Sequence, residues 1–365
     1  MKPILPAIIL FAMPALALAV ESPEVHPDGT VTFNLSAPKA REVQLHCEGV
    51  PDSAMTKDAS GVWTFTTKAL DPDIYTYTFE VDGVRMIDPS NPFLKYNLLN
   101  SVSQVEVPGP DSLPWQMADV PHGELHRHFY KSAVCGDQRD YIVYTPPGYK
   151  PASSKRYPVL YLLHGFSDDT TAWTEAGRAN IILDNLIARG QTKPMIVVMP
   201  LGYGDMAVLK APDGPPGNAV RQRSLDKFTE ALLTEVIPAV QSEYHVSNDR
   251  RSRAIAGLSM GGRESLSVGL NHLDEFSWIG AFSSGTITNY STTFPTLDAG
   301  ANKRIRLLWI GCGNDDHLLA GNQRFCDWLQ SKDVRFTWVE LPGQHSYRVW
   351  RRDLAQFVPL LFRNK

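Results

Sequence analysis

The chain has 365 residues, of which 43% are hydrophobic and 20% are charged, values close to those of an ordinary globular protein. This composition excludes intrinsic disorder, collagen and coiled coils, and the length suggests two domains or one large domain with an appendage. The formal net charge is −4, with 35 Lys and Arg against 39 Asp and Glu, and no long run of like charges. We therefore expect neither nucleic acid nor an acidic membrane surface as a partner.

Residues 1–19 have the features of an export signal. Lys2 supplies a positive start, Ile4 to Leu18 is almost wholly apolar, and Ala17 and Ala19 are the small residues that a signal peptidase recognises. A membrane anchor is the alternative, but about 15 apolar residues interrupted by prolines fall short of the roughly 20 that a spanning helix needs. We expect cleavage after Ala19 and a secreted or periplasmic mature protein without a membrane segment.

The cysteines lie at positions 47, 135, 312 and 326 and form neither a CxxC pair nor a metal-ligand spacing with histidine. This spacing disfavours zinc, and we expect no metal and no other cofactor. Cys312 and Cys326 are near enough in sequence to form a disulfide in an oxidising compartment, and two buried free thiols are an equally good interpretation. The sequence leaves these two states open.

Residues 22–107 have the pattern of a small β-sandwich. Short alternating runs separated by turn residues predict strands over Thr30–Leu35, Glu42–Cys47, Val62–Thr66 and Ile74–Val81. In the last of these runs the tyrosines and Phe79 share one face, and the Asp82-Gly83 turn that follows is typical of a hairpin. The proline-rich residues 108–121 then predict a linker.

From residue 122 to 365, short apolar runs alternate with helical patterns, which is typical of a mostly parallel sheet covered by helices. The predicted strands are Tyr141–Tyr144, Val159–Leu163, Met195–Met199, Ala254–Ala256, Trp278–Phe282, Leu307–Gly311 and Phe336–Leu341. Helices are predicted over Ser224–Ser242, with Ser224 as N-cap, and over Tyr347–Phe362. Gly202 to Arg223 is rich in Gly, Pro and charge, and we expect a long loop that shapes a substrate pocket with Trp173 and Tyr203.

The run Gly257-Leu258-Ser259-Met260-Gly261 fits G-x-S-x-G, a motif in which a strand turns sharply into a helix and leaves a serine hydroxyl exposed. Alone this pattern is weak evidence, because a structural serine in a glycine turn would give it too. The context strengthens it, since a short buried strand precedes the motif and a helix over Met260 to Leu270 can follow. We therefore identify Ser259 as the candidate nucleophile.

A serine nucleophile needs a histidine base, which in turn needs a carboxylate to hold its orientation. Of the histidines after Ser259, His345 lies in a loop directly after the last predicted strand and before a closing helix, which makes it the best candidate. For the acid, the strand Leu307–Gly311 is followed by Asp315 and Asp316, at the edge where α/β sheets assemble their sites. Spacing alone leaves both carboxylates open.

The oxyanion that forms on a substrate carbonyl needs preorganised backbone donors. One should be the N–H of Met260, the residue after the candidate nucleophile. The second should come from the loop after the strand Val159–Leu163, where His164-Gly165-Phe166 occurs, and we expect it to be the Phe166 N–H.

Several of these runs can be compared with a known family. The segments are RDYIVYTPPGY from Arg139, YPVLYLLHG, DNLIARG, KPMIVVMPLG, GLSMGG and the closing GQHSYRVWRRDLAQFVPLLF. In this combination and order the chain resembles the esterase D-type hydrolases, particularly carbohydrate esterase family 1, over nearly all of residues 122–365. The resemblance implies an α/β-hydrolase fold. In that family the acid lies in a G-x-x-D-x-L segment, which matches residues 313–318 and implies Asp316.

The front domain also resembles a known module. Its residues 75–83 and the run DPSNP at 88–92 are similar to the Ig-like module found before glycogen-branching enzymes and some carbohydrate esterases. That resemblance suggests polysaccharide binding, in which Trp63 or an outward tyrosine would stack on a sugar ring. The alternation fits a sandwich core better, so we expect a structural partner that completes the active-site rim.

The resemblance implies a secreted serine esterase that removes feruloyl, and next acetyl, groups from plant cell-wall polysaccharide. One alternative is an enterochelin-type siderophore esterase, which shares both the catalytic fold and a front sandwich domain. Another is a noncatalytic glycan-binding protein on an esterase fold, which the presence of all three triad residues disfavours. An acyltransferase stays open, because water and sugar hydroxyls compete for the same acyl-enzyme. Neither the acyl group nor the oligomeric state follows from the sequence.

Overall fold

The computed structural model describes residues 20–151, 154 and 156–363. The predicted signal peptide, residues 1–19, lies outside the described residues. The chain forms two compact units. The first comprises the chain up to Leu70 together with Tyr77–Pro92, and the second comprises Asp71–Thr76 and the chain from Phe93 onward.

The first unit consists of short antiparallel strands. One sheet has the order β1-β2-β6-β5, and β3 pairs with β4 and β7, which also pairs with β8. In β2 buried and less buried residues alternate, so Phe33 faces the core, where its ring packs against Tyr77 with 4.6 Å between ring centroids. The predicted all-β front region is thereby confirmed. The strand bounds are β1 (Glu24–Val25), β2 (Val31–Ser36), β3 (Val43–Cys47), β4 (Ser53–Ala54), β5 (Thr56–Lys57), β6 (Val62–Thr66), β7 (Asp73–Val81) and β8 (Val84–Met86).

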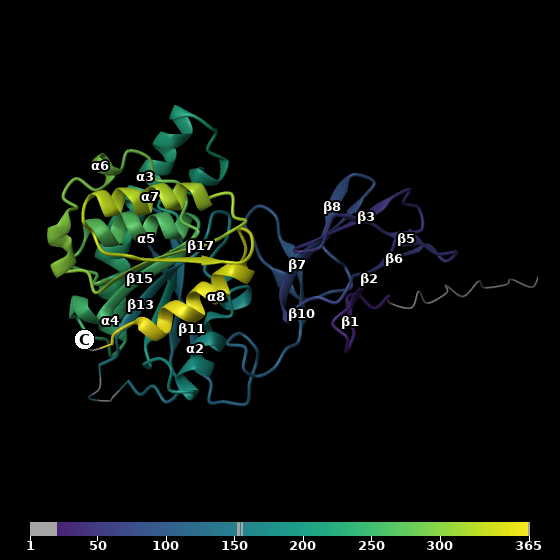
Figure 1. Cartoon of the computed structure of the whole chain (residues 1–365), viewed down its shortest axis with the longest axis horizontal. Helices are drawn as coiled ribbons and strands as arrows, with labels where there is room; N and C mark the ends of the chain where they lie inside the picture. The colour runs from purple at the N-terminus through teal and green to yellow at the C-terminus, as the bar shows by residue number, and fades with distance from the viewer. Residues whose placement is uncertain (1–19, 152–153, 155, 364–365) are drawn as a thin grey trace, which may run out of the picture. The chain divides into compact units, whose positions relative to one another are not determined.

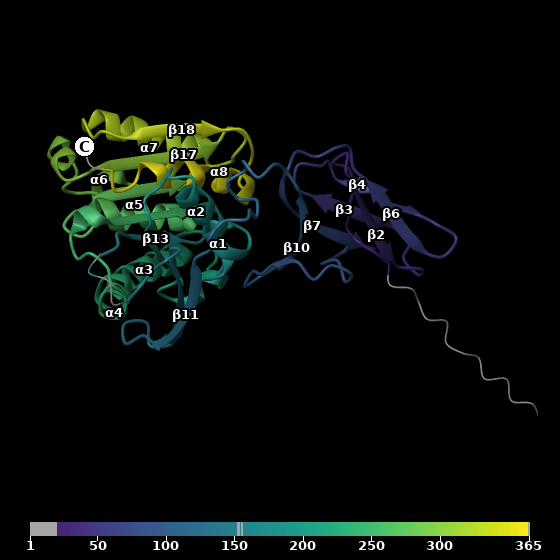
Figure 2. The ribbon, with the colours of Figure 1, turned by 90° about the horizontal axis from the view of Figure 1, so that it is seen from below.

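The second unit is built on an eight-stranded sheet in the order β11-β12-β14-β13-β15-β16-β17-β18. Figure 2 shows this sheet from β18 at one edge to β11 at the other. The pairs β11–β12 and β12–β14 are antiparallel, and the remaining pairs are parallel. The strand bounds are β11 (Glu124–Lys131), β12 (Gln138–Thr145), β13 (Val159–Leu163), β14 (Ile196–Pro200), β15 (Arg253–Leu258), β16 (Trp278–Phe282), β17 (Leu307–Gly313) and β18 (Thr337–Leu341). Two further strands, β9 (Leu94–Lys95) and β10 (Val102–Val107), pair with each other.

Helices cover both faces of the eight-stranded sheet (Figure 1). The helices α3, α4, α5 and α7 pack on one face and α2 and α8 on the other, so each face has its own apolar core. Because both faces are covered, every residue of the central strands β13 to β16 is buried. This arrangement confirms the predicted α/β-hydrolase fold. The helix bounds are α1 (Ala172–Glu175), α2 (Ala179–Ala188), α3 (Pro215–Ala231), α4 (Ile237–Glu243), α5 (Met260–Asn271), α6 (Tyr290–Thr293), α7 (Leu319–Ser331) and α8 (Tyr347–Phe357).

Two details of the predicted elements are wrong, and one edge strand is missing from the prediction. Ser224 is not an N-cap but a buried residue inside α3, which begins at Pro215 after an N-cap at Gly214. The predicted long loop over 202–223 is therefore helical in its second half, because a proline is well tolerated in the first helical turn. The edge strand β11 was not predicted, since its mostly polar sequence acquires strand structure only by pairing with β12.

The units divide the chain differently from the predicted boundary at residues 108–121. Asp71–Thr76 and the segment from Phe93 belong to the second unit, where they form hydrogen bonds. Asp73 accepts one from Arg351 at 2.6 Å, and Glu106 accepts one from Arg178 at 2.9 Å. Such contacts join residues far apart in the sequence, which is why local composition did not reveal them.

The four cysteines all lie in the described part of the chain and are free thiols. Cys312 and Cys326 are both buried, and burial raises the pKa of each thiol to about 12. Among the residues that the structure describes, no helix has both the length and the apolarity to cross a membrane.

Candidate active site

Ser259 lies in a sharp turn between β15 and α5. Its φ of 51° is in the left-handed region, a strained conformation for a residue with a side chain. The turn requires small neighbours, since a Cβ on Gly261 would lie 2.5 Å from the His164 carbonyl oxygen and one on Gly257 would lie 2.6 Å from Gly261. The glycines therefore allow the backbone to approach closely and leave Ser259 partly exposed at the carboxyl end of β15.

The structure brings the three residues of the predicted triad together. His345 Nε2 lies 2.9 Å from Ser259 Oγ, and His345 Nδ1 lies 2.8 Å from Asp316 Oδ2. His345 stands in the loop between β18 and α8, and Asp316 follows β17, so all three residues lie past the carboxyl ends of parallel strands. These two hydrogen bonds form a relay in which the carboxylate orients the imidazole toward the hydroxyl.

The geometry also separates the two acids that sequence spacing left open. Asp315 is exposed, whereas Asp316 is buried and faces His345. Asp316 also accepts a hydrogen bond from the Leu318 N–H at 2.8 Å. Burial alone would raise the pKa of the Asp316 carboxyl, but the hydrogen bonds from His345, Leu318 and Ser283 outweigh it and lower the pKa. Asp316 is therefore held as a carboxylate.

Two aromatic rings fix the position of the His345 ring. Trp350 of α8 packs edge-on against it at 4.9 Å between ring centroids, and Trp350 Nε1 donates to Ser283 Oγ at 3.0 Å. The exposed His317 ring lies 4.7 Å from that of His345, measured between ring centroids. One donor atom each of Asp316, His317 and His345 lies within 4.8 Å of the others, so these residues could hold a metal ion. Two of the three, however, already hydrogen-bond each other in the relay.

Met260 follows Ser259 directly in the chain, and Phe166 stands in a turn that packs against Ser259. Met260 is the first residue of α5, a position whose N–H has no partner within the helix. Phe166 stands in a tight turn closed by a hydrogen bond from the Asp168 N–H to the Gly165 carbonyl oxygen at 3.2 Å. A Cβ on Gly165 would lie only 3.6 Å from Ser259 Cβ, so this turn packs directly against the nucleophile.

The Gly165–Asp168 turn is held by side chains that sequence reasoning missed. The buried Asp168 carboxylate accepts hydrogen bonds from Lys95 at 2.6 Å, Asn97 at 3.0 Å and Tyr347 at 2.9 Å. Asn97 also donates to Ser167 Oγ at 2.9 Å. No local motif marks these residues, because the segment with Lys95 and Asn97 and the segment with Tyr347 are both far from Asp168 in the sequence and meet it only in the folded chain.

Trp173 and Tyr203, which we expected at the substrate pocket, lie in the interior of the fold. Their exposed fractions are 1% and 0%, so neither side chain can reach a substrate. Trp173 Nε1 donates to the Leu163 carbonyl oxygen at 2.9 Å, and the Tyr203 hydroxyl donates to the Asp168 carbonyl oxygen at 3.0 Å. The prediction of substrate contact is wrong. These rings are buried, and their polar atoms hydrogen-bond the backbone on either side of the Gly165–Asp168 turn.

Apolar side chains are exposed beside the same turn instead. Phe166 is 45% exposed, and Leu98 and Leu99 are 43% and 47% exposed. The Leu98 N–H donates to the Ser167 carbonyl oxygen at 2.7 Å, which places this pair of leucines against the turn. A cluster of exposed large apolar side chains at a candidate site suggests a surface for an apolar part of a ligand.

Comparison with known proteins identifies the family. The model of the family described as putative esterase matches residues 132–361, which include the turn after β13, the nucleophile elbow and both other triad residues. The chain belongs to this esterase family. The match begins after the front unit and ends in the described C-terminal residues, so it covers most of the second unit.

Individual relatives are similar over a larger part of the chain. An endo-1,4-beta-xylanase/feruloyl esterase of Xylanibacter ruminicola is 30% identical over 354 residues, which are 94% of this chain and 46% of that relative. The chain thus spans about half the length of this curated relative.

Solved structures share the fold. A ferulic acid esterase of Anaeromyces mucronatus is 24% identical with a TM-score of 0.60, covering 70% of this chain and 96% of that one. An enterobactin esterase of Shigella flexneri is 20% identical with a TM-score of 0.65, covering 90% of this chain and 92% of that one.

Proposed function

We propose that the protein is a serine esterase that hydrolyses acyl esters of plant cell-wall polysaccharide, feruloyl esters first and acetyl esters next. The observation that carries this proposal is the continuous relay from Asp316 through His345 to Ser259, with hydrogen bonds of 2.8 and 2.9 Å. A hydroxyl next to an oriented imidazole is an activated nucleophile.

In the first half-reaction Ser259 Oγ attacks the ester carbonyl carbon while its proton moves to His345 Nε2. The carbonyl electron pair moves onto the oxygen, and the N–H groups of Met260 and Phe166 stabilise that negative charge; each such donor contributes about 3 kcal/mol. When the intermediate collapses, the bond to the sugar oxygen breaks and His345 returns its proton to the departing hydroxyl. The acyl group remains on Ser259.

In the second half-reaction a water molecule takes the place of the sugar. His345 accepts the proton of the water as its oxygen attacks the acyl carbon, and the same donors stabilise the second oxyanion. Collapse releases the carboxylic acid and returns the proton to Ser259 Oγ. Asp316 stays ionised throughout and orients the imidazole, because its pKa is lowered by the groups that bond it. A sugar hydroxyl in place of water would give acyl transfer.

The apolar side chains beside the oxyanion turn support an aromatic acyl group. Phe166, Leu98 and Leu99 expose apolar area next to the donor that would bind the carbonyl oxygen. The aromatic ring of a feruloyl group, joined to that carbonyl through a CH=CH link, would contact this area, whereas an acetyl group is too short to use it. The relative in Xylanibacter ruminicola is an endo-1,4-beta-xylanase/feruloyl esterase, which agrees with this choice.

A second candidate is the hydrolysis of a siderophore ester of the enterobactin type. The enterobactin esterase structure covers 90% of this chain, whereas the ferulic acid esterase structure covers 70%. This greater coverage is the observation that favours it. A noncatalytic glycan-binding protein is disfavoured, because the relay and the turn beside it would then have no use.

We infer that residues 22–107 act as a structural partner of the hydrolase and that the mature protein is exported. The aromatic residues that could have stacked on sugar are buried, Trp63 at 7% and Tyr77 at 2% exposed. Trp63 Nε1 also donates to the Ala37 carbonyl oxygen at 3.0 Å, which fixes the ring. Both features favour a core role for these rings.

An activity panel tests the proposed function. The purified mature protein is assayed on methyl ferulate, acetylated xylan and enterobactin, with Ser259→Ala as the matched control for each substrate. We expect the highest kcat/KM on methyl ferulate. A higher value on enterobactin would establish the second candidate, and equal rates of protein and Ser259→Ala on all three substrates would refute the esterase function.

A further inference from the structure

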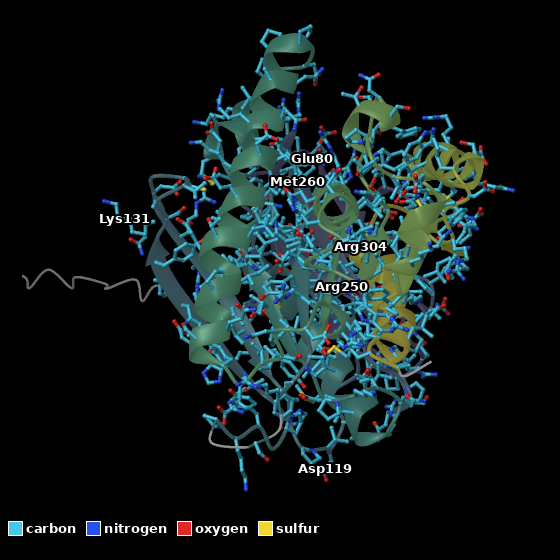
Figure 3. The ribbon with its side chains drawn as sticks, turned by 90° about the vertical axis from the view of Figure 1, so that its left-hand side faces the viewer. Glu80, Asp119, Lys131, Arg250, Met260 and Arg304 are labelled. Carbon is cyan, nitrogen blue, oxygen red and sulfur yellow. The ribbon has the colours of Figure 1, made fainter. Side chains whose placement is uncertain are left out.

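A strongly basic surface lies at the amino ends of the parallel strands, and the triad lies at their carboxyl ends. Two adjoining hollows of about 490 and 540 Å³ open there and share Trp278, Arg306 and Arg363. Trp278 begins β16, whereas Ser259 follows the other end of the neighbouring β15. Figure 3 views the molecule from the side on which the C-terminus lies in Figure 1 and labels Arg250 and Arg304. We call the basic residues that line the hollows the basic face: Arg156, Lys193, Arg251, Arg306, Arg335 and Arg363.

Most of the positive charge of the basic face has no paired carboxylate among the residues that the structure describes. The hollows are lined by these six basic residues and by one acid, Asp249, in a chain whose net charge is −4. Asp249 pairs with Arg251 at 2.6 Å. Among the described residues, none of the other five has a carboxylate within ion-pair distance. Such a concentration of one sign in an acidic protein attracts anions to this surface.

Backbone carbonyl groups hold several of these side chains without neutralising them. Arg156 donates to the Val246 carbonyl oxygen at 3.0 Å, and Lys193 donates to that of Phe362 at 2.6 Å. Arg335 likewise donates to the Asn302 carbonyl oxygen at 3.1 Å. Partly fixed cations lose less conformational freedom when a ligand binds, which favours binding.

The adjacent Arg250 shows how closely the positive charges are crowded. Burial and the nearby Arg304 lower the pKa of Arg250, and Arg251 and Arg306 lower it further, while Asp249 opposes them. Mutual repulsion of this kind destabilises the folded chain and is relieved when anions bind. Guanidinium groups bind carboxylates through paired hydrogen bonds, which makes a carboxylate-bearing ligand a good match.

We propose that the basic face binds the carboxylate groups of an acidic cell-wall polysaccharide, such as xylan that carries uronic acid side groups. The choice of a polysaccharide rests on the proposed function, since a polymer can occupy the triad and a distant surface at the same time. The basic face then holds the polymer near the enzyme and raises the local concentration of its esters. The basic face takes no part in the chemical step, because it lies at the opposite ends of the strands from the triad.

The test is a binding measurement on the full mature chain with glucuronoxylan and with the same xylan after its carboxyl groups have been reduced to alcohols. The test variant is Arg306→Glu with Arg363→Glu. The matched control is Lys131→Glu with Arg324→Glu, two exposed residues outside the hollows that give the same change in net charge. Thermal unfolding of both variants establishes that they fold.

We expect the Kd of the test variant for glucuronoxylan to rise at least tenfold and that of the control to change less than twofold. Raising the salt concentration should weaken binding of the unaltered chain, because salt screens exposed charges. Hydrolysis of methyl ferulate should be the same in all three proteins, so a failed esterase assay would refute the proposed function without touching this result.

Three outcomes would overturn the proposal. The first is equal binding of glucuronoxylan by the test variant and the unaltered chain. The second is equal binding of the carboxyl-reduced xylan, which would mean that carboxylates are not recognised. The third is that the unaltered chain binds duplex DNA or anionic lipid vesicles more tightly than glucuronoxylan at the same salt concentration, and that the test variant loses this binding. The basic face would then serve a phosphate-bearing partner.

Discussion

Lys95 Nζ donates a hydrogen bond to Asp168 Oδ1 at 2.6 Å, although the two residues are 73 positions apart. The side chains are 16% and 5% exposed, so the ion pair is largely shielded from water. Asp168 closes the turn that carries the Phe166 N–H, and the turn packs against Ser259. A residue from the segment before the predicted hydrolase region therefore positions one proposed oxyanion donor.

The substitution Lys95→Met tests this positioning role. We expect kcat for methyl ferulate to fall about 10- to 100-fold, because a shift of the donor by about 1 Å costs this much in rate, with a smaller change in KM. Lys131→Met is the matched control, since Lys131 is exposed. A kcat for Lys95→Met within twofold of the unaltered enzyme would mean that the turn keeps its position without the ion pair.

Neighbouring aspartates give a second test. Asp316→Asn should reduce kcat by on the order of a thousandfold or more, because an amide at this position stabilises the wrong tautomer of His345. Asp315→Asn removes a carboxylate of the same size from an exposed position and should leave kcat nearly unchanged. The test compares kcat of both variants in steady-state kinetics. A larger loss of kcat for Asp315→Asn than for Asp316→Asn would mean that Asp315 is the catalytic acid.

Ser259 and His345 were predictable because local sequence marks the position of each. The elbow around Ser259 needs glycines at fixed spacing, and His345 follows the last strand of a regular alternation. The choice of Asp316 over Asp315 needed the family resemblance, since a change of one position in a loop carries no periodic signal. Fold class followed from the same alternation of strands and helices.

Interactions between distant segments were not predictable. Lys95, Asn97 and Tyr347 meet at Asp168 only after folding, and no spacing in the sequence links them. Trp173 was expected to line a substrate pocket together with the loop over 202–223, but its depth in the fold depends on packing that composition does not reveal. The edge strand β11 likewise depends on its partner β12 rather than on its own apolar pattern.

Asp73 provides a prediction about stability and pH. It is buried and accepts hydrogen bonds from Arg351 at 2.6 Å and Arg352 at 2.7 Å, both on the helix that follows the His345 loop. Asp73→Asn should destabilise the protein by about 3–5 kcal/mol at pH 7, because it leaves buried arginine charge unpaired. Asp71→Asn, at an exposed position in the same segment, is the matched control.

The pH dependence of this effect has a definite sign. Burial would raise the pKa of Asp73, but Arg351 and Arg352 outweigh it and lower the pKa below its usual value of 3.8. The folded state therefore favours the carboxylate, and the stability it contributes is present above that value and is lost as the pH falls through the lower folded pKa. Thermal unfolding from pH 3 to 8 should show a constant gap between protein and variant above about pH 5. A gap that grows toward acid would contradict the ion-pair account.

Removing residues 20–107 tests the role of the front of the chain. The deletion takes away Asp73, Lys95 and Asn97, which form hydrogen bonds within the second unit. We therefore expect reduced thermal stability and loss of activity on both methyl ferulate and insoluble arabinoxylan. Loss on arabinoxylan alone, with full activity on methyl ferulate and unchanged stability, would instead support a tethered sugar-binding module.

The most direct measurement for the central claim is the turnover of methyl ferulate by Ser259→Ala beside the unaltered enzyme. The hydroxyl forms the acyl-enzyme, and a partly exposed elbow residue contributes little packing, so the variant should fold normally. We predict that kcat falls by on the order of a thousandfold or more, with thermal unfolding unchanged. Turnover by Ser259→Ala close to that of the unaltered enzyme would contradict the assignment of Ser259, and with it the catalytic relay through His345 and Asp316.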